Sequence, residues 1–170
     1  MTNFVPSITV DQVIDAVGNF ISLFTTAQII RGNVNRTAMP IAPFVELTEI
    51  SNTALNKAIE YYSDTTATIN EHKRVDVQVD FYGWDLSDTA QAVHTAYRTI
   101  WGVTKFPSNI VPLYCNEPMK MPIENAEEQY EQRWTMTMSL QYNPDVTVPQ
   151  DTFNTKGDTG VIPADVIYPA

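Results

Sequence analysis

Residues 127–150, EEQYEQRWTMTMSLQYNPDVTVPQ, contain the clearest strand pattern in the chain. Successive side chains of a strand point to opposite faces, so an alternation of apolar and polar residues gives the strand one apolar face. Here the large apolar residues Trp134, Met136, Met138, Leu140 and Tyr142 alternate with Thr135, Thr137, Ser139 and Gln141. We predict a core strand over 132–142 in a sheet covered on one face, with Trp134 and Met138 in the core.

Two further strands are predicted upstream. Residues 75–82 alternate strictly, and their two faces are Val75, Val77, Val79 and Phe81 against Asp76, Gln78, Asp80 and Tyr82. Residues 44–50 place Val45 and Leu47 on one face and Phe44, Thr48 and Ile50 on the other. The pattern leaves residues 51–66 open between a short helix, a loop and the start of a long strand.

Two segments carry apolar residues at the three- and four-residue steps of a helix. The first, 10–25, follows Thr9 and Gln12, a capping-box pair whose side chains bond the free N–H groups of the first turn. The second, 86–103, has Asp85 or Ser87 as its expected N-cap. Its apolar stripe, which is expected to pack on the sheet, is Leu86, Ala90, Val93, Tyr97, Ile100 and Trp101.

The remaining segments are punctuated by glycine and proline. Residues 28–43 and 106–126 are predicted to be connections, the second holding a short apolar piece at 110–115. Together these patterns predict an α+β domain over residues 1–143, with a mainly antiparallel sheet flanked by helices. Residues 144–170 have isolated apolar pieces between prolines and predict an extended C-terminal arm. Such an arm lies on its own domain or on a neighbouring subunit, and strand addition to a sheet edge is one known mode.

Composition excludes several classes of protein. The chain of 170 residues has 20 acidic and 10 basic side chains, a formal net charge of -10, which argues against a protein that grips nucleic acid through its phosphates. The single cysteine excludes an intrachain disulfide and fits a reducing compartment. The first residues do not form a signal-peptide pattern, and no stretch approaches the ~18–20 apolar residues of a membrane span.

The sequence shows no motif for catalysis, metal binding or a cofactor. His72, His94 and Cys115 have no partners at ligand or nucleophile spacing, so we expect them to be structural. Asp76 and Asp80 share a strand face, which leaves a small hydrolase as the weakest hypothesis. Arg133 follows the acidic cluster Glu124, Glu127, Glu128 and Glu131, and we expect it to pair with a carboxylate of that cluster or of another subunit.

Aromatic residues favour contact with other proteins. The tyrosines at 61, 62, 82, 130 and 142 and Trp84 are too many for all to point inward, and exposed Tyr and Trp are typical of interfaces. The candidate interface residues are Arg36, Tyr82, Trp84, Tyr130, Arg133, Val146, Val148 and Tyr168.

Three ordered pieces of the chain resemble the neck or tail terminator (tail-completion) proteins of tailed bacteriophages. The first is Asn35-Arg36-x-x-Met39-Pro40 with Pro43-Phe44-Val45. The second is VQVDFYG at 77–83, leading into Asp88-x-Ala90. The third and most specific joins PLY at 112–114, Pro118-x-x-Met121-Pro122-Ile123, Glu128-Gln129-Tyr130-Glu131-x-Arg133-Trp134-Thr135, LQYNP at 140–144 and VTVPQ at 146–150. The resemblance covers about residues 8–150; nothing in 51–74 or in the last 20 residues matches.

This resemblance implies an α+β protein without catalytic activity or cofactor. It implies a ring, expected to be a hexamer, at the head-proximal end of the tail tube. Such a ring ends tube polymerisation and contacts the tail tube protein and the head-tail connector or neck proteins. DNA passes through its lumen without specific binding. The expected location is the virion tail or neck, after assembly in the host cytoplasm and without a membrane. The alternative is a head-completion or tail-tube protein of the same neck region.

Overall fold

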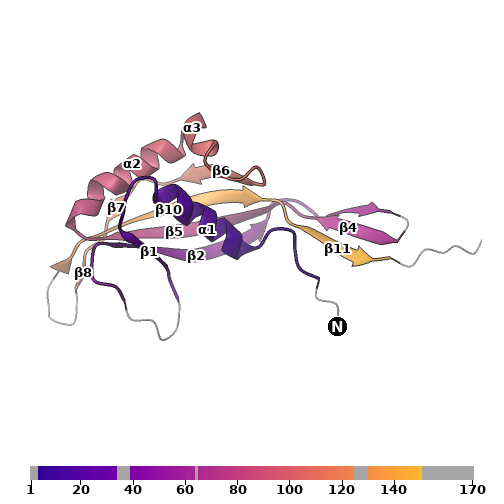
Figure 1. Cartoon of the computed structure of the whole chain (residues 1–170), viewed down its shortest axis with the longest axis horizontal. Helices are drawn as coiled ribbons and strands as arrows, with labels where there is room; N and C mark the ends of the chain where they lie inside the picture. The colour runs from indigo at the N-terminus through magenta and orange to yellow at the C-terminus, as the bar shows by residue number, and fades with distance from the viewer. Residues whose placement is uncertain (1–3, 34–38, 64, 125–129, 151–170) are drawn as a thin grey trace, which may run out of the picture.

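The structure is a computed structural model, and it describes residues 4–33, 39–63, 65–124 and 130–150. The helices and strands of these residues form an α+β fold (Figure 1). In chain order they are α1 (Val10–Ile21), β1 (Gln28–Arg31), β2 (Phe44–Ala54), β3 (Ile59–Tyr62), β4 (Thr66–Asn70), β5 (Lys73–Tyr82), the 3-10 turn η1 (Trp84–Leu86), α2 (Ser87–Tyr97), α3 (Ile100–Val103), β6 (Ile110–Cys115), β7 (Met119–Lys120), β8 (Ile123–Glu124), β9 (Tyr130–Glu131), β10 (Arg133–Tyr142) and β11 (Asp145–Pro149).

The predicted core strand is β10, and it lies inside the main sheet. The strand order is β1-β2-β5-β10-β6, and β7 also pairs with β10. Only the β1–β2 pair of this described sheet is parallel, which confirms the mainly antiparallel prediction. Helix α1 packs over the β2 side and α2 over β10 and β6, both on the same face (Figure 1).

The core forms between the helices and the alternating apolar positions of β5 and β10. Met138 is fully buried, as predicted, and it lies opposite Val77 in the antiparallel register. Trp134 is half-buried and packs against the edge of the core. The prediction that Trp134 lies inside the core is therefore wrong. Its place at the second residue of β10, opposite Lys120 of the two-residue strand β7, explains its partial exposure.

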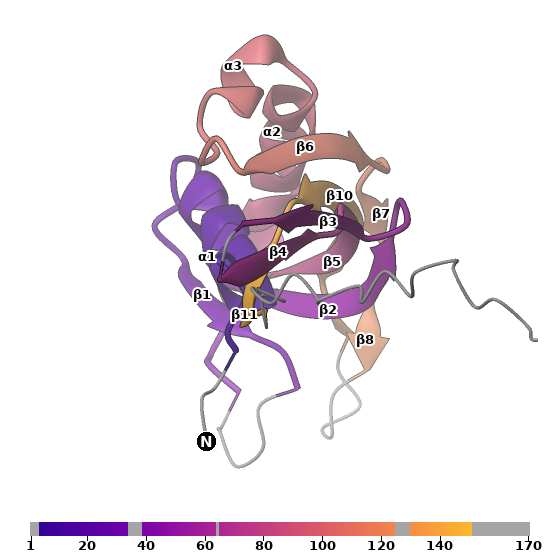
Figure 2. The same ribbon diagram turned by 90° about the vertical axis from the view of Figure 1, so that its right-hand side faces the viewer.

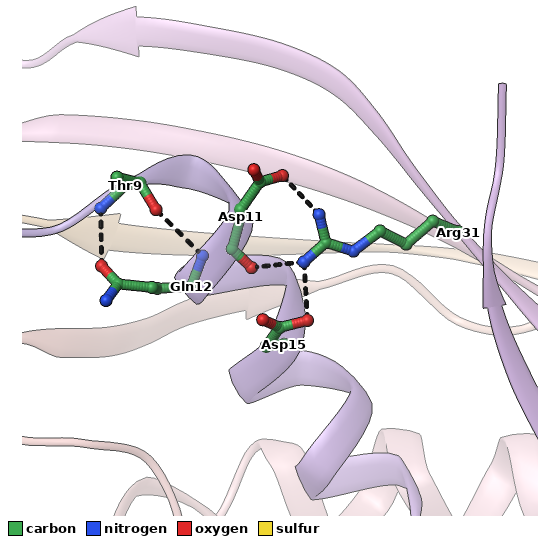
Figure 3. Close-up of polar contacts among 5 residues, drawn as sticks. All are labelled: Thr9, Asp11, Gln12, Asp15 and Arg31. Atoms are coloured by element: carbon green, nitrogen blue, oxygen red, sulfur yellow. Dashed lines mark hydrogen bonds and ion pairs between the residues drawn. The ribbon is translucent and has the colours of Figure 1, made fainter. Parts of the chain in front are cut away.

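Helix α1 begins as the capping box predicts. The Thr9 hydroxyl accepts from the N–H of Gln12 at 3.3 Å, and the Gln12 side chain accepts from the N–H of Thr9 at 2.9 Å (Figure 3). The helix ends at Ile21 instead of residue 25, with Ser22 as its C-cap. Its buried face consists of Val13, Ile14, Ala16, Val17, Phe20 and Ile21.

The second predicted helix is broken into two. Thr99 interrupts it: its hydroxyl donates to the carbonyl oxygen of Ala96 at 2.7 Å and accepts from the N–H of Gly102 at 3.1 Å. This makes Thr99 the N-cap of α3, which turns back on the end of α2. Gly102 is required there, because a Cβ atom would overlap the carbonyl oxygen of Ala96. Ile100 is 87 % exposed as a result, so its predicted place in the buried stripe is wrong.

The expected caps of this second helix are also not used. The turn η1 precedes α2, whose N-cap is Leu86 without a side-chain hydrogen bond. Neither Asp85 nor Ser87 is the N-cap, because the chain enters the helix through this tight turn.

Both predicted connections contain strands. Residues 28–31 form β1 at one edge of the main sheet, and the apolar piece at 110–115 is β6 at the other edge. Pro112 fits in β6 because an edge strand leaves one row of backbone groups unpaired. These two strands are short and broken by irregular neighbours, so their periodicity alone does not identify them.

The open segment 51–66 belongs to a second sheet. Strand β2 continues to Ala54, and after a turn β3 pairs with β4, which pairs in turn with β11. We call β3, β4 and β11 the extension, because they project beyond one end of the main sheet (Figure 1) and lie in front of it in Figure 2. Residues 145–149 of the predicted arm thus form a strand of the chain's own sheet. Residues 151–170 lie outside the described residues.

Candidate functional site

The face of the main sheet that lies opposite the helices is polar. Asp76 accepts hydrogen bonds from Ser51 of β2, at 2.6 Å, and from Ser139 of β10. Arg74 lies 3.3 Å from the same carboxylate. The Asp76 side chain of β5 thus links three neighbouring strands. This carboxylate, which the hydrolase hypothesis treated as catalytic, makes structural hydrogen bonds.

A buried charge pair lies further along this face. Asp80 is 3 % exposed; its Oδ1 lies 3.5 Å from Nε of Arg133, and its Oδ2 accepts from Gln78 at 2.7 Å. Arg133 therefore pairs with a carboxylate, as predicted, but with one on β5. Antiparallel pairing brings the start of β10 beside the end of β5. The side chains of Glu124, Glu127 and Glu128, predicted partners in the acidic cluster, lie outside the described residues.

Tyr82 lies next to this pair. Its ring stacks on Phe44 of β2, with centroids 4.4 Å apart, and its hydroxyl donates to Glu46 at 3.1 Å. Burial, with the negative charge of Glu46, raises the pKa of Tyr82 to about 12. Tyr82 is only 4 % exposed, so its side chain offers little surface to another protein.

The Asp76 carboxylate should make the free energy of unfolding depend on pH in the acidic range. Burial alone would raise its pKa, but the hydrogen bonds from Ser139 and Ser51 and the charge of Arg74 outweigh it and hold the pKa below its ordinary value. This stabilisation is present above the unfolded-state pKa, about 3.9, and is lost as pH falls through the lower folded-state value. Urea unfolding of Asp76→Asn should therefore show a weaker loss of stability below about pH 4 than the unchanged chain. The exposed control Asp85→Asn should follow the unchanged chain, and identical pH slopes for all three would contradict the account.

The two histidines and the cysteine occupy structural positions. The backbone of His72 accepts from the N–H of Leu55 at 2.7 Å, and its own N–H donates to Asn56 at 2.8 Å, so it closes the turn at the base of the extension. His94 is buried at the end of α2. Cys115 is buried under the same helix, with Sγ 3.9 Å from the carbonyl oxygen of His94.

Cys115 should be unreactive in the folded chain. Burial raises the pKa of this thiol to about 11, so little thiolate is present near neutral pH. We expect a thiol-specific reagent such as Ellman's reagent to react roughly 100-fold or more slowly at pH 8 with the folded chain than with the urea-unfolded chain. Equal rates in the two states would show that the thiol is accessible.

Neither a metal centre nor a membrane span is found in the part of the chain that the structure describes. No group of three or more His, Cys, Asp or Glu side chains there is placed to hold a metal ion. No helix among the same residues is long and apolar enough to cross a membrane.

The predicted interface residues fall in several places. Trp84 is 73 % exposed, and Val146 and Val148 are half-buried on β11. Arg133 is half-buried in its pair with Asp80. Arg36, Tyr168 and the side chain of Tyr130 lie outside what the structure describes. The structure thus does not bring these residues together into one site.

An exposed apolar surface lies at the ends of two helices, and it includes Ile100 and Trp101 of the predicted buried stripe. We call Leu23, Ile100, Trp101 and Val103 the helical patch; all four are exposed. Trp101 anchors it, because its ring contacts Phe24 at 6.1 Å and Phe20 at 6.5 Å, and Nζ of Lys105 lies 4.8 Å from its centre. Exposed aromatic and aliphatic side chains held on a rigid base are typical of a protein contact surface.

A second, partly exposed apolar surface lies on the extension, where Ala67 is buried and Ile69, Val146 and Val148 are half-buried. Tyr62 of β3 lies level with Ala67 of β4 and Val148 of β11, and Glu60 lies level with Ile69 and Val146. These six side chains share one face, which we call the apolar face of the extension. Tyr62 is 66 % exposed there, and its hydroxyl donates to Glu60.

Sequence reasoning missed one contact that fixes the edge of the sheet. Arg31 of β1 pairs with Asp11 and, at 2.6 Å, with Asp15, and also donates to the carbonyl oxygen of Asp11 at 2.9 Å (Figure 3). The hydrogen bond to Asp15 is the main cause that raises the pKa of Arg31. The two carboxylates are four residues apart on α1, and this spacing was the available signal for a shared cation.

The carboxylates Asp76 and Asp80 thus make structural contacts, and apolar side chains are exposed on the helical patch. The chain belongs to the family of phage neck terminator proteins, whose family model matches residues 11–164. This confirms the resemblance in the sequence and makes the chain a structural protein of the bacteriophage neck. No curated protein matches the chain.

Proposed function

We propose that this chain is a tail terminator that forms a ring at the head-proximal end of the phage tail tube. The ring ends polymerisation of the tube and joins the tail to the head connector, without catalysing a reaction. Membership of the phage neck terminator family supports this role. A hexamer, assembled in the host cytoplasm before it joins the virion, is the form that the resemblance implies.

One structural observation carries the proposal: among the residues that the structure describes, the helical patch and the apolar face of the extension are unlike surfaces in separate places. A cyclic ring uses a heterologous contact, in which one surface of a subunit meets a different surface of the next. The helical patch is formed by helix ends, whereas the apolar face of the extension is formed by strands. In both Figure 1 and Figure 2, α3 lies away from the extension. Two unlike surfaces in separate places favour a closed ring with heterologous contacts, because a two-fold symmetric dimer would use the same surface on both subunits.

The charge of the chain supports passage of DNA through the ring. With a net charge of -10, the subunit has little attraction for phosphate, so DNA can slide without being held. The polar face of the main sheet carries Glu46, Asp76 and Asp80, and two of these carboxylates neighbour arginines. Salt-dependent binding of duplex DNA to the purified chain is therefore not expected.

Tube assembly in vitro tests this function. Purified tail tube protein is allowed to polymerise with increasing amounts of the chain, and tube lengths are measured by negative-stain electron microscopy. A terminator shortens the tubes in proportion to its concentration and caps one end. Unchanged lengths would overturn the proposal. Long polymers of the chain alone would favour a tube protein, and binding to the isolated connector without binding to tubes would favour a head-completion protein.

A further inference from the structure

The apolar face of the extension continues the core face of the main sheet. The alternation of β10 passes through Asn143-Pro144 without a change of side: Leu140 and Tyr142 are buried in the core, and Val146 and Val148 follow on the extension. Strands β4 and β5 are related in the same way, from Val75 back to Ile69 and Ala67. The apolar face of β10 therefore continues along β11, and the apolar face of β5 continues along β4.

Helices cover only part of this face. In the main sheet, α1 and α2 bury it. Where α1 begins, the face opens into a groove of about 380 Å³, lined in part by Pro6, Ile8, Ile69, Tyr142, Pro144 and Val146. Beyond this groove, Tyr62 is 66 % exposed and Val148 is half-buried. An apolar sheet face of this kind is normally packed against a second layer.

The helical patch is the complementary surface. Ile100 and Val103 of α3 are 87 % and 45 % exposed, so both side chains lie on the surface. In Figure 1, α1 and α2 lie over the main sheet and not over the extension.

The charges around the two surfaces are also complementary. Residues 98–106 contain Arg98 and Lys105 and no acidic residue. Residues 59–70 contain Glu60 and Asp64 and no basic residue, and β11 adds Asp145. Opposite charge at the rim of two apolar surfaces sets their orientation and their choice of partner.

We infer that the apolar face of the extension docks on the helical patch of the next copy of this chain. This inference rests on the proposed ring and names the two surfaces that meet in it. In this contact, Tyr62 of one subunit packs against Ile100 and Trp101 of the next. Glu60 of the first subunit lies towards Lys105 of the second. Each subunit thereby gives its extension to one neighbour and receives the extension of the other.

Two one-sided variants test this arrangement. Tyr62→Lys disables the extension and leaves the patch, whereas Ile100→Lys disables the patch and leaves the extension. Each variant alone should self-associate at least about 30-fold more weakly than the unchanged chain, the effect of losing a hot-spot residue. Mixed together they retain one good contact, so they should form a 1:1 dimer and nothing larger. Fluorescence anisotropy gives the affinity, and sedimentation gives the mass.

Two matched controls keep the test specific. Tyr61→Lys changes the other face of the same strand, and Ala92→Lys changes an exposed position of α2; both should assemble like the unchanged chain. Circular dichroism checks that every variant is folded. As a second measurement, Lys105→Glu should restore the assembly that Glu60→Lys weakens.

The outcomes separate this inference from the proposed function. A dimer that forms only in the mixture supports the docking arrangement. Variants that assemble like the unchanged chain, or a mixture that stays monomeric while the unchanged chain forms rings, would overturn it and point to another occupant, such as residues 151–170. An unchanged chain that stays monomeric both with and without tail tubes would overturn the ring itself.

Discussion

Phe20→Ala should lower the free energy of unfolding by about 3–5 kcal/mol, the usual cost of removing a buried phenylalanine ring. Phe20 is fully buried at the end of α1, and its ring centre lies 5.1 Å from Phe106 and 6.0 Å from Tyr97. It also contacts Trp101, so it links α1 to α2 and to the segment after it. The substitution opens a cavity at the point where the helices meet.

Urea unfolding followed by circular dichroism measures this effect. The control is Leu23→Ala, three residues further on and exposed, which should cost less than about 1 kcal/mol. Phe20 packs against Trp101, which belongs to the helical patch. Phe20→Ala should therefore also weaken self-association. A loss of stability below about 1 kcal/mol would show that this aromatic cluster does not hold the helices together.

Arg133→Met should destabilise the chain by about 3 kcal/mol, because it leaves the buried Asp80 carboxylate without its cation. The hydrogen bond from Gln78 would remain on that side chain. The same urea measurement applies. The double variant Arg133→Met with Asp80→Asn removes the uncompensated charge and should recover most of the loss. A double variant that is as unstable as the sum of the two single variants would contradict a direct coupling.

The core elements could be predicted from the sequence because their patterns are regular. Strand β10 and the last eight residues of β5 alternate strictly, and Thr9 with Gln12 marks the start of α1. The edge strands β1 and β6 could not be predicted in the same way, because they are short and gain their pairing from neighbours far away in the chain. The break at Thr99 was hidden because a capping hydroxyl interrupts a helix without disturbing its apolar spacing.

The contact surfaces were harder to predict than the fold. The aromatic residues pointed to protein contact, but sequence alone did not separate Tyr82, which is buried against Phe44, from Tyr62, which is exposed. Ile100 was assigned to the core by its spacing and lies on the surface instead. Val146 and Val148 were candidates from the start, and the register now places them on the face that we propose to be covered by another subunit.

Electron microscopy of the purified chain, with and without tail tubes, tests the central claim most directly. The account predicts closed rings of uniform size, either free in solution or capping one end of the tubes. A chain that remains a monomer at high concentration and leaves both tube ends bare would contradict it.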